Sequence, residues 1–365
     1  MTPTSGPPRR ASGPASPASG PAGRAFLAVD GGNSKTDVLV ADTSGALLAH
    51  VRGAGYRPHE GGFDRAVDTV ADLVNRALAD AGGPPPALVS AYMANVDLPD
   101  EERALVKALR DRGWTDRVTV GNDTFALLHT GARRGWGVAV VCGAGINCVG
   151  VAPDGARVSF PSLGAHTGDW GGGGTLGEAA LWHAVRAEDG RGPATALTAA
   201  VAAHFGAASA VDVGIALHVG DIHRDRLLAL TPVLMDVAEA GDQVALSVVD
   251  RQAEEIALLG TAALRRLGLL DRPTEVVLGG GVLSARRPPL MAGVERRFAG
   301  AAPHAELIVA DAPPVLGAAL LALAELAADE PPEDGADERL RAACARRWTP
   351  PGAAPGAGRG SPKKS

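Results

Sequence analysis

The chain has 365 residues, which suits two domains at the usual size of roughly 100 to 200 residues each. Hydrophobic residues make up 46% and aromatic residues only 4%, so the interior is expected to consist mainly of Ala, Val and Leu. The formal net charge of −6 provides no basic field for a polyanion, which argues against nucleic acid as the main partner but not against a small anion bound locally.

Cysteine usage and the chain ends predict a cytoplasmic protein. Cys142, Cys148 and Cys344 form no CxxC pair and leave an odd residue over, which favours reduced thiols rather than a disulfide framework or a zinc site. Residues 1–24 are rich in Pro, Ser, Ala and Gly and lack the apolar stretch of a signal peptide. The apolar run 315–324 is too short to span a bilayer, so no membrane association is expected.

The stretch 26–42 predicts two short apolar strands joined by a polar glycine turn. Glycines let a backbone approach a phosphate closely, while hydroxyl, amide and ammonium groups supply donors. Asp30, at the end of the first strand, can hold a hydrated Mg²⁺ against those phosphates. An ordinary hairpin with a polar loop is the alternative. The expected phosphate-binding residues of this turn are Gly31, Gly32, Asn33, Ser34, Lys35 and Thr36.

Alternating elements follow the first hairpin. Residues 50–62 are read as a strand end and a loop, and 63–81 show apolar residues at helical spacing. A strand at 88–93, a helix at 101–112 and a strand at 117–120 complete a mixed sheet flanked by helices.

Asp123 follows the strand 117–120 and precedes a helix predicted over 124–133. A carboxylate at the carboxyl end of a strand is well placed to take a proton from a bound hydroxyl. The alternative is that Asp123 merely caps the helix.

Residues 136–155 repeat the layout of strand, glycine turn and strand, with Gly143, Ala144 and Gly145 in the turn. Two such hairpins facing each other would clamp a polyphosphate. A dinucleotide-binding fingerprint is rejected because Cys148 stands at the third glycine position and no helix follows.

The segment 163–177 is the richest in glycine. Its GxGxxG match lacks a preceding strand and is read as accidental, and Thr175 with Glu178 has the spacing of a capping box. Asp169 has no evident structural task, whereas His166 is read as a loop residue.

Helical patterns occupy 176–267, followed by a strand at 275–278 that ends in Gly279, Gly280 and Gly281. This glycine run either forms a nucleoside shelf or is a plain turn. A strand at 307–310 and a helix at 315–327 end the fold, and residues beyond 328 are expected to form a disordered tail.

Five motifs, by their residues and their order along the chain, together resemble the N-acetylglucosamine kinase and BadF/BadG-type ATPase family of the sugar kinase, Hsp70 and actin superfamily. DGGNSKTD resembles its first phosphate motif, VVCGAGINCVG its second, VVLGGGVL its adenosine motif, NDTFA its catalytic segment and GDWGGGG its sugar-side loop.

The resemblance implies an α/β fold of two ribonuclease-H-like (actin-like ATPase) domains with ATP and Mg²⁺ in the cleft. The domains would span 25–122 and 123–313, with 314–328 returning to the first. Asp123 would be the base for phosphorylation of an amino sugar, N-acetylglucosamine first, and Asn147 would join the ATP ligands. The implied sugar-side residues are Arg57, Asn122, Gly168 and Asp169.

Two departures concern the sugar side, because Arg57 stands where Asn is common and Trp170 where the family has an acid. Glucosamine, N-acetylmuramic acid or a hexose therefore stay open as acceptors. A homodimer stays open as the oligomeric state. An activator ATPase holding an iron–sulfur cluster is the alternative of another class. A repressor is disfavoured because residues before Phe26 are too few and too polar for a helix-turn-helix.

Overall fold

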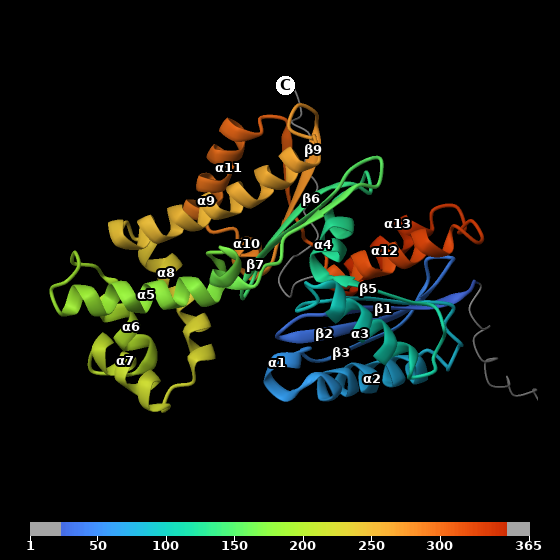
Figure 1. Ribbon diagram of the computed structural model, residues 1–365, viewed down its shortest axis with the longest axis horizontal. Helices are drawn as coiled ribbons and strands as arrows, with labels where there is room; N and C mark the ends of the chain where they lie inside the picture. The colour runs from blue at the N-terminus through green and yellow to red at the C-terminus, as the bar shows by residue number, and fades with distance from the viewer. Residues whose placement is uncertain (1–22, 349–365) are drawn as a thin grey trace, which may run out of the picture.

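The computed structural model describes residues 23–348, which form two α/β units side by side and a helical lobe (Figure 1). Each unit is built on a five-stranded sheet, with strand orders β3-β2-β1-β4-β5 and β10-β9-β6-β7-β8. In both sheets an antiparallel hairpin is extended by a third antiparallel strand on one side and by two parallel strands on the other. The two sheets therefore share one topology, and the predicted fold class of two ribonuclease-H-like units is confirmed.

The first sheet is apolar because it is covered on both faces. Val29 pairs with Val38 across the antiparallel hairpin and with Ala91 on the parallel side, and all three are buried. The strands are β1 Ala25–Gly31, β2 Lys35–Asp42, β3 Leu47–Ala54, β4 Val89–Met93 and β5 Val118–Asn122.

Helices cover the two faces of this sheet as separate layers (Figure 1). The helix α2 Phe63–Asp80 packs on β2 and β3, and α3 Pro99–Arg110 packs on β5. The helix α12 Pro314–Leu326 packs on β1 and β4 from the opposite side. A single turn, α1 Pro58–Gly61, precedes α2.

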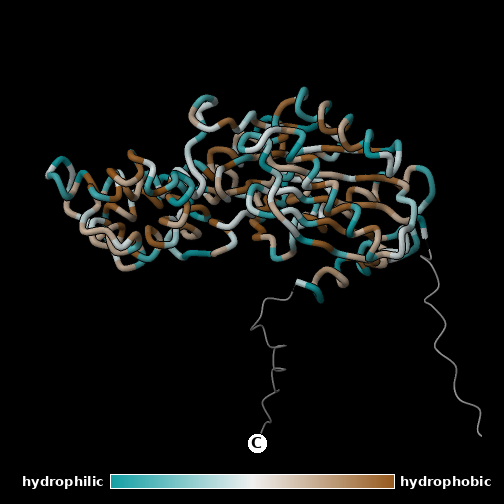
Figure 2. Tube along the Cα trace, turned by 90° about the horizontal axis from the view of Figure 1, so that it is seen from below, coloured by the Kyte–Doolittle hydropathy of each residue, from teal (hydrophilic) through white to brown (hydrophobic). Residues whose placement is uncertain are grey.

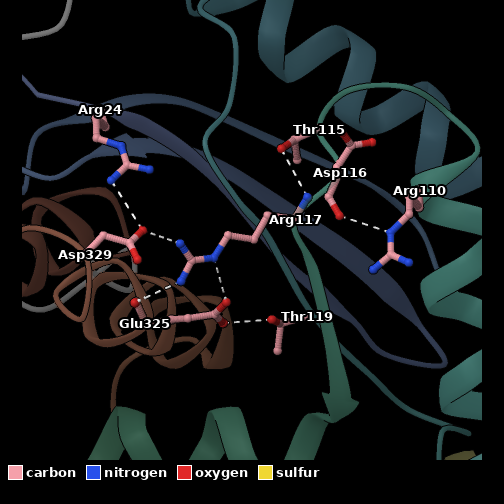
Figure 3. A network of polar contacts seen from close by, with 8 residues as sticks. All are labelled: Arg24, Arg110, Thr115, Asp116, Arg117, Thr119, Glu325 and Asp329. Atoms are coloured by element: carbon pink, nitrogen blue, oxygen red, sulfur yellow. Dashed lines mark hydrogen bonds and ion pairs between the residues drawn. The ribbon is translucent and has the colours of Figure 1, made fainter.

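A polar network fixes α12 to the edge strand β5 (Figure 3). Arg117 donates to the Glu325 carboxylate over 3.0 Å and also pairs with Asp329, while the Thr119 hydroxyl donates to Glu325 over 2.7 Å. These contacts join residues about two hundred positions apart, so the last helix of the core closes back on the first unit.

The second sheet packs against α9 and α11 on one face and against α4 on the other. Its strands are β6 Gly137–Cys142, β7 Ile146–Val151, β8 Arg157–Ser159, β9 Thr274–Gly279 and β10 Ala305–Val309. The helices are α4 Asp123–Gly131, α9 Gln243–Arg266, α10 Gly281–Ser284 and α11 Pro288–Ala301. Because α4 contacts both α12 and β6, it lies between the two units.

The helical lobe projects from the second unit, to the left in Figure 1. It comprises η1 Gly164–Thr167, α5 Gly172–Glu188, α6 Leu197–Phe205, α7 Ala210–Val219, η2 Arg224–Ala229 and α8 Leu230–Glu239. Along the trace, apolar segments concentrate in the interior and polar segments on the outside (Figure 2). Among residues 23–348 no single helix has both the length and the apolar composition to cross a bilayer, although α6 and α7 together pass that test as a bent pair.

Two expectations about local structure were wrong. Residues 336–347, expected in a disordered tail, form the helix α13 because Leu340 and Cys344 are buried against the cluster of β1 and α12. The helix α5 begins at Gly172, so Thr175 lies inside it and no capping box forms; Glu178 instead pairs with Arg224. The predicted tail 1–24 falls almost entirely outside the described residues.

Candidate active site

The first glycine turn connects β1 to β2 at the edge of the first sheet. Its backbone closes through Gly32 N–H, which donates to the Lys35 carbonyl over 2.9 Å. A Cβ on Gly55 would stand 2.2 Å from the Asn33 carbonyl oxygen, so the following loop packs directly on the turn. Ser34 and Lys35 have exposed side chains that a ligand can reach, and Lys35 Nζ also lies 3.8 Å from the Asp37 carboxylate.

The second glycine turn, between β6 and β7, carries the start of α5. Gly173 and Gly174 donate their N–H groups to the carbonyls of Gly143 and Ala144 over 2.8 and 2.9 Å. Gly172 has φ +83°, and a Cβ there would stand 2.4 Å from the Gly145 backbone. The glycine run of α5 therefore allows a helix N-terminus to pack on the turn, a reason that the sequence motif did not reveal.

The third glycine segment joins β9 to α10. Gly280 has φ +85°, and a Cβ there would stand 2.5 Å from the backbone of Cys142, which precedes the second turn. The second and third segments are thus in direct backbone contact.

Two cavities lie in this part of the molecule, with volumes of about 580 and 630 Å³. Residues of all three glycine segments line the larger one. The larger cavity, about 630 Å³, is lined by Ser34 and Lys35, by Gly143 and Ala144, and by the run Gly279–Gly281. Its remaining walls come from α4, α5, η2, α8, α10, α12 and neighbouring loops. Its volume lies in the range of ordinary ligand pockets. Residues from three distant sequence motifs therefore meet at one ligand-sized hollow, as expected from their glycine content.

Two acidic side chains lie close enough to influence each other near these turns. Burial, followed by the charges of Asp123 and Asp37, raises the pKa of Asp30 well above its usual range. Burial also raises the pKa of Asp123 to about 6, against hydrogen bonds from Thr124 that lower it. A nearby cation would favour the ionised form of both carboxylates. The donor chemistry at Asp30 therefore fits a Mg²⁺ held through water.

Asp123 is the first residue of α4, and Asn122 is the residue that caps this helix. The Asn122 side chain accepts from Thr124 N–H over 2.9 Å, so capping does not depend on Asp123. The capping alternative for Asp123 is thereby removed.

Asp97 was missed by the sequence analysis. It lies in the loop after β4, and its Oδ1 accepts from the amides of Asn122 over 2.8 Å and Asn147 over 3.2 Å. Burial raises the pKa of Asp97 to about 7, with further contributions from Asp123 and Glu101. Its position after the carboxyl end of a parallel strand was the available signal.

Asn147 was expected among the ATP ligands, but the structure groups it with Asp97. Its side-chain oxygen Oδ1 accepts from Cys148 N–H and from the Ser162 hydroxyl, each over 2.6 Å. Asn147 lines the smaller cavity, about 580 Å³, together with Asp97 and Asn122. Asn147 is therefore a lining residue of the smaller cavity and not of the glycine-lined one.

The other expected sugar-side residues occupy different surroundings. Asp169 accepts from the Thr167 hydroxyl over 2.5 Å, and its charge contributes to raising the pKa of Asp97, so the two carboxylates lie within electrostatic range. Gly168 ends η1 in the left-handed conformation with φ +86°. Arg57 instead donates to the Asn33 carbonyl over 2.5 Å and pairs with Glu60, which ties it to the first turn.

Comparison with known proteins identifies the family from the sequence and the fold from solved structures. The model of the BadF/BadG/BcrA/BcrD ATPase family matches residues 27–322. N-acetyl-D-glucosamine kinase of Dictyostelium discoideum is 25% identical over 312 residues, covering 82% of this chain and 97% of that protein. N-acetylmuramic acid/N-acetylglucosamine kinase of Clostridium acetobutylicum is 22% identical over 260 residues, covering 71% and 85%.

Two solved structures show the same fold. A candidate N-acetylglucosamine kinase from Chromobacterium violaceum superposes with a TM-score of 0.65 at 24% identity, covering 82% of this chain and 99% of that one. A ROK family glucokinase from Streptomyces griseus, solved with glucose and AMPPNP, has a TM-score of 0.54 at 18% identity, covering 81% and 98%.

Proposed function

Because this chain belongs to the BadF/BadG/BcrA/BcrD ATPase family, we propose that it is an ATP-dependent sugar kinase that phosphorylates an amino sugar, with N-acetylglucosamine as the first candidate. The observation that carries the proposal is the cavity of about 630 Å³ shared by the three glycine segments. The names of the Dictyostelium and Clostridium relatives support the choice of an amino sugar as acceptor.

In this proposal the polyphosphate lies between the first and second glycine turns. Ser34 and Lys35 approach it from one side and the Gly143–Ala144 backbone from the other, because these groups line one cavity. Donors held in fixed positions stabilise the charge that develops during phosphoryl transfer. The run Gly279–Gly281 would receive the nucleoside.

Asp30 would hold Mg²⁺ through water. The cation, when bound, supplies positive charge that offsets the phosphate oxygens. Asp30 suits this role because it is buried, with 6% of its surface exposed, and because burial and the charges of Asp123 and Asp37 raise its pKa, which a bound cation would offset.

Asp123 would act as the catalytic base. A bond forms between an acceptor hydroxyl oxygen and the γ-phosphorus, the bond from that phosphorus to the bridging oxygen breaks, and ADP leaves with the electron pair. The hydroxyl proton passes to Asp123, whose pKa of about 6 leaves it ionised at neutral pH. The acceptor would approach from the side of Asn122 and Asp169, with Gly168 allowing the left-handed turn that precedes Asp169.

The cysteines favour the kinase over an activator that carries an iron–sulfur cluster between subunits. Cys142, Cys148 and Cys344 are all buried, and burial raises the pKa of each thiol. Cluster binding requires thiolates that reach a shared surface.

The deciding experiment is a panel of acceptors in an ADP-release assay with Mg·ATP. We expect release to depend on N-acetylglucosamine, glucosamine or N-acetylmuramic acid more strongly than on glucose. The Arg57→Asn variant is expected to change the order of preference within the panel, because Arg57 stands where amino-sugar kinases of the family commonly carry Asn. ADP release that no sugar increases, together with iron–sulfur absorbance in the purified protein, would replace the kinase by the activator.

A further inference from the structure

The cluster around Asp97 joins the two α/β units at one point. Asp97 follows β4 of the first sheet, Asn122 ends β5 of the same sheet, and Asn147 belongs to β7 of the second sheet. A single carboxylate oxygen, Asp97 Oδ1, accepts from both amides over 2.8 and 3.2 Å. Each half of the molecule therefore donates to the same atom.

The position of Asp97 is itself fixed from several sides. Its backbone N–H and that of Leu98 donate to Glu101 Oε2, each over 2.9 Å, at the start of α3. Asn95, two residues earlier, has φ +59° and donates to the Asn33 side chain over 2.8 Å. A left-handed asparagine is uncommon and carries a conformational cost, so the loop is held by its contacts. The loop therefore links Asp97 to the first glycine turn.

The amide partners lead in turn to the proposed reaction centre. Asn122 caps α4, whose first residue is Asp123. Asn147 holds Ser162, which lies just before the segment that carries Asp169. Asp97 thus accepts from Asn122, which precedes the proposed base Asp123. It also accepts from Asn147, which is hydrogen-bonded to Ser162 in the segment leading to Asp169.

We propose that Asp97 is a positioning residue. Its simultaneous hydrogen bonds to Asn122 and Asn147, called the clasp below, hold the two units together and orient Asp123. This inference rests on the proposed kinase function. Asp97 need not touch the acceptor: it acts through the cap of α4 and through β7. Loss of the clasp lets the units separate and admits water, which competes with the sugar for the γ-phosphoryl group.

The network predicts the effect of removing the carboxylate. Asp97→Ala removes the acceptor of both amide hydrogen bonds at once, so it should lower kcat with the sugar by about 10- to 100-fold. The KM for Mg·ATP should change little, because Asp97 does not line the glycine cavity. The ratio of sugar phosphorylated to ADP released should fall as water replaces the sugar. Asp100→Ala is the matched control, since Asp100 lies three residues away and pairs only with the exposed Arg103 among the described contacts.

A reciprocal exchange separates positioning from general damage to the fold. Asn147→Asp alone would place two carboxylates face to face and should be the most impaired variant. The double variant Asp97→Asn with Asn147→Asp restores a donor and an acceptor across the units. The carboxylate at position 147 can still accept from Cys148 N–H and the Ser162 hydroxyl. The amide oxygen at position 97 can accept from Asn122. We expect this double variant to regain at least tenfold of the activity that Asn147→Asp loses.

The outcomes distinguish this inference from the proposed function. A wild-type protein without sugar-dependent ADP release contradicts the proposed kinase function. The clasp is then tested by thermal unfolding, in which the double variant must have a higher midpoint temperature than Asn147→Asp. If the wild type is a kinase, equal kcat and equal coupling ratio for Asp97→Ala and Asp100→Ala overturn the inference. An exchange variant no better than Asn147→Asp overturns it in either case.

Discussion

Gly280 offers a direct test of how the nucleotide cavity is shaped. Its backbone has φ +85° and ψ +155°, a region that only glycine adopts readily, and an added Cβ would lie 2.5 Å from both the carbonyl carbon and oxygen of Cys142. The backbone strain of Gly280→Ala costs about 1–3 kcal/mol. The overlap costs about a further 1–3 kcal/mol if the neighbours shift. The atoms that must shift are backbone atoms at the start of the second glycine turn, so the variant should lose both stability and affinity for Mg·ATP.

The matched variant is Gly281→Ala, one residue later. Gly281 starts α10 with an ordinary backbone conformation, and nothing lies within 4 Å of its added Cβ. It should keep the wild-type unfolding free energy, whereas Gly280→Ala should lose about 2–6 kcal/mol. Denaturant titration measures the stability, and calorimetry with Mg·ATP measures the affinity, which should fall at least tenfold in Gly280→Ala. Wild-type stability and affinity in Gly280→Ala would refute the contact between the third glycine segment and the second turn.

Further predictions concern the acids and the last helix. Asp123→Asn should bind Mg·ATP normally but lose about 100- to 10,000-fold in sugar-dependent ADP release; a fully active variant would disprove the assigned base. Because Asp123 must be ionised to accept a proton and its pKa is raised to about 6, kcat/KM for the sugar should be constant above that pH and decrease as pH falls through it; a profile flat to pH 4, about the ordinary pKa of an aspartate, would count against this. Asp30→Asn should raise the Mg²⁺ concentration needed for half-maximal activity, and an unchanged requirement would argue against its cation role. Leu340→Ala should lower the unfolding free energy by about 2–5 kcal/mol because Leu340 is fully buried; the exposed Arg346→Ala is its control, and equal stability of the two would contradict the packing of α13.

The sequence alone identified the elements whose signals are local. Runs such as those around Val29, Val140 and Val277 are short, apolar and bounded by glycines, which is sufficient to predict strands and turns. Asp30 and Asp123 were identified because each stands at the end of such a strand. The order of these motifs also indicated the family, and the family match bears this out. The ligands at these positions are still predictions.

What required the tertiary structure was every relation between residues distant in sequence. The run Gly172–Gly174 was assigned only to a sugar-side loop, because a motif records spacing along the chain, whereas its packing depends on the backbone of Gly143 and Ala144. Asn147 was assigned to ATP by its place in a motif, but the pleat of β7 turns its side chain towards Asp97.

Residues 336–347 show the same limit in composition-based reasoning. Their polar composition suggested disorder, yet two apolar residues, Leu340 and Cys344, are buried in the same hydrophobic cluster as residues of β1 and α12. The chain by itself determined its strands, its turns and its family, since those follow from local preference and pattern. The clasp at Asp97, the shared cavity and the docking of α13 were decided only by folding, because a hydrogen bond or a buried contact depends on where the partner lies in space.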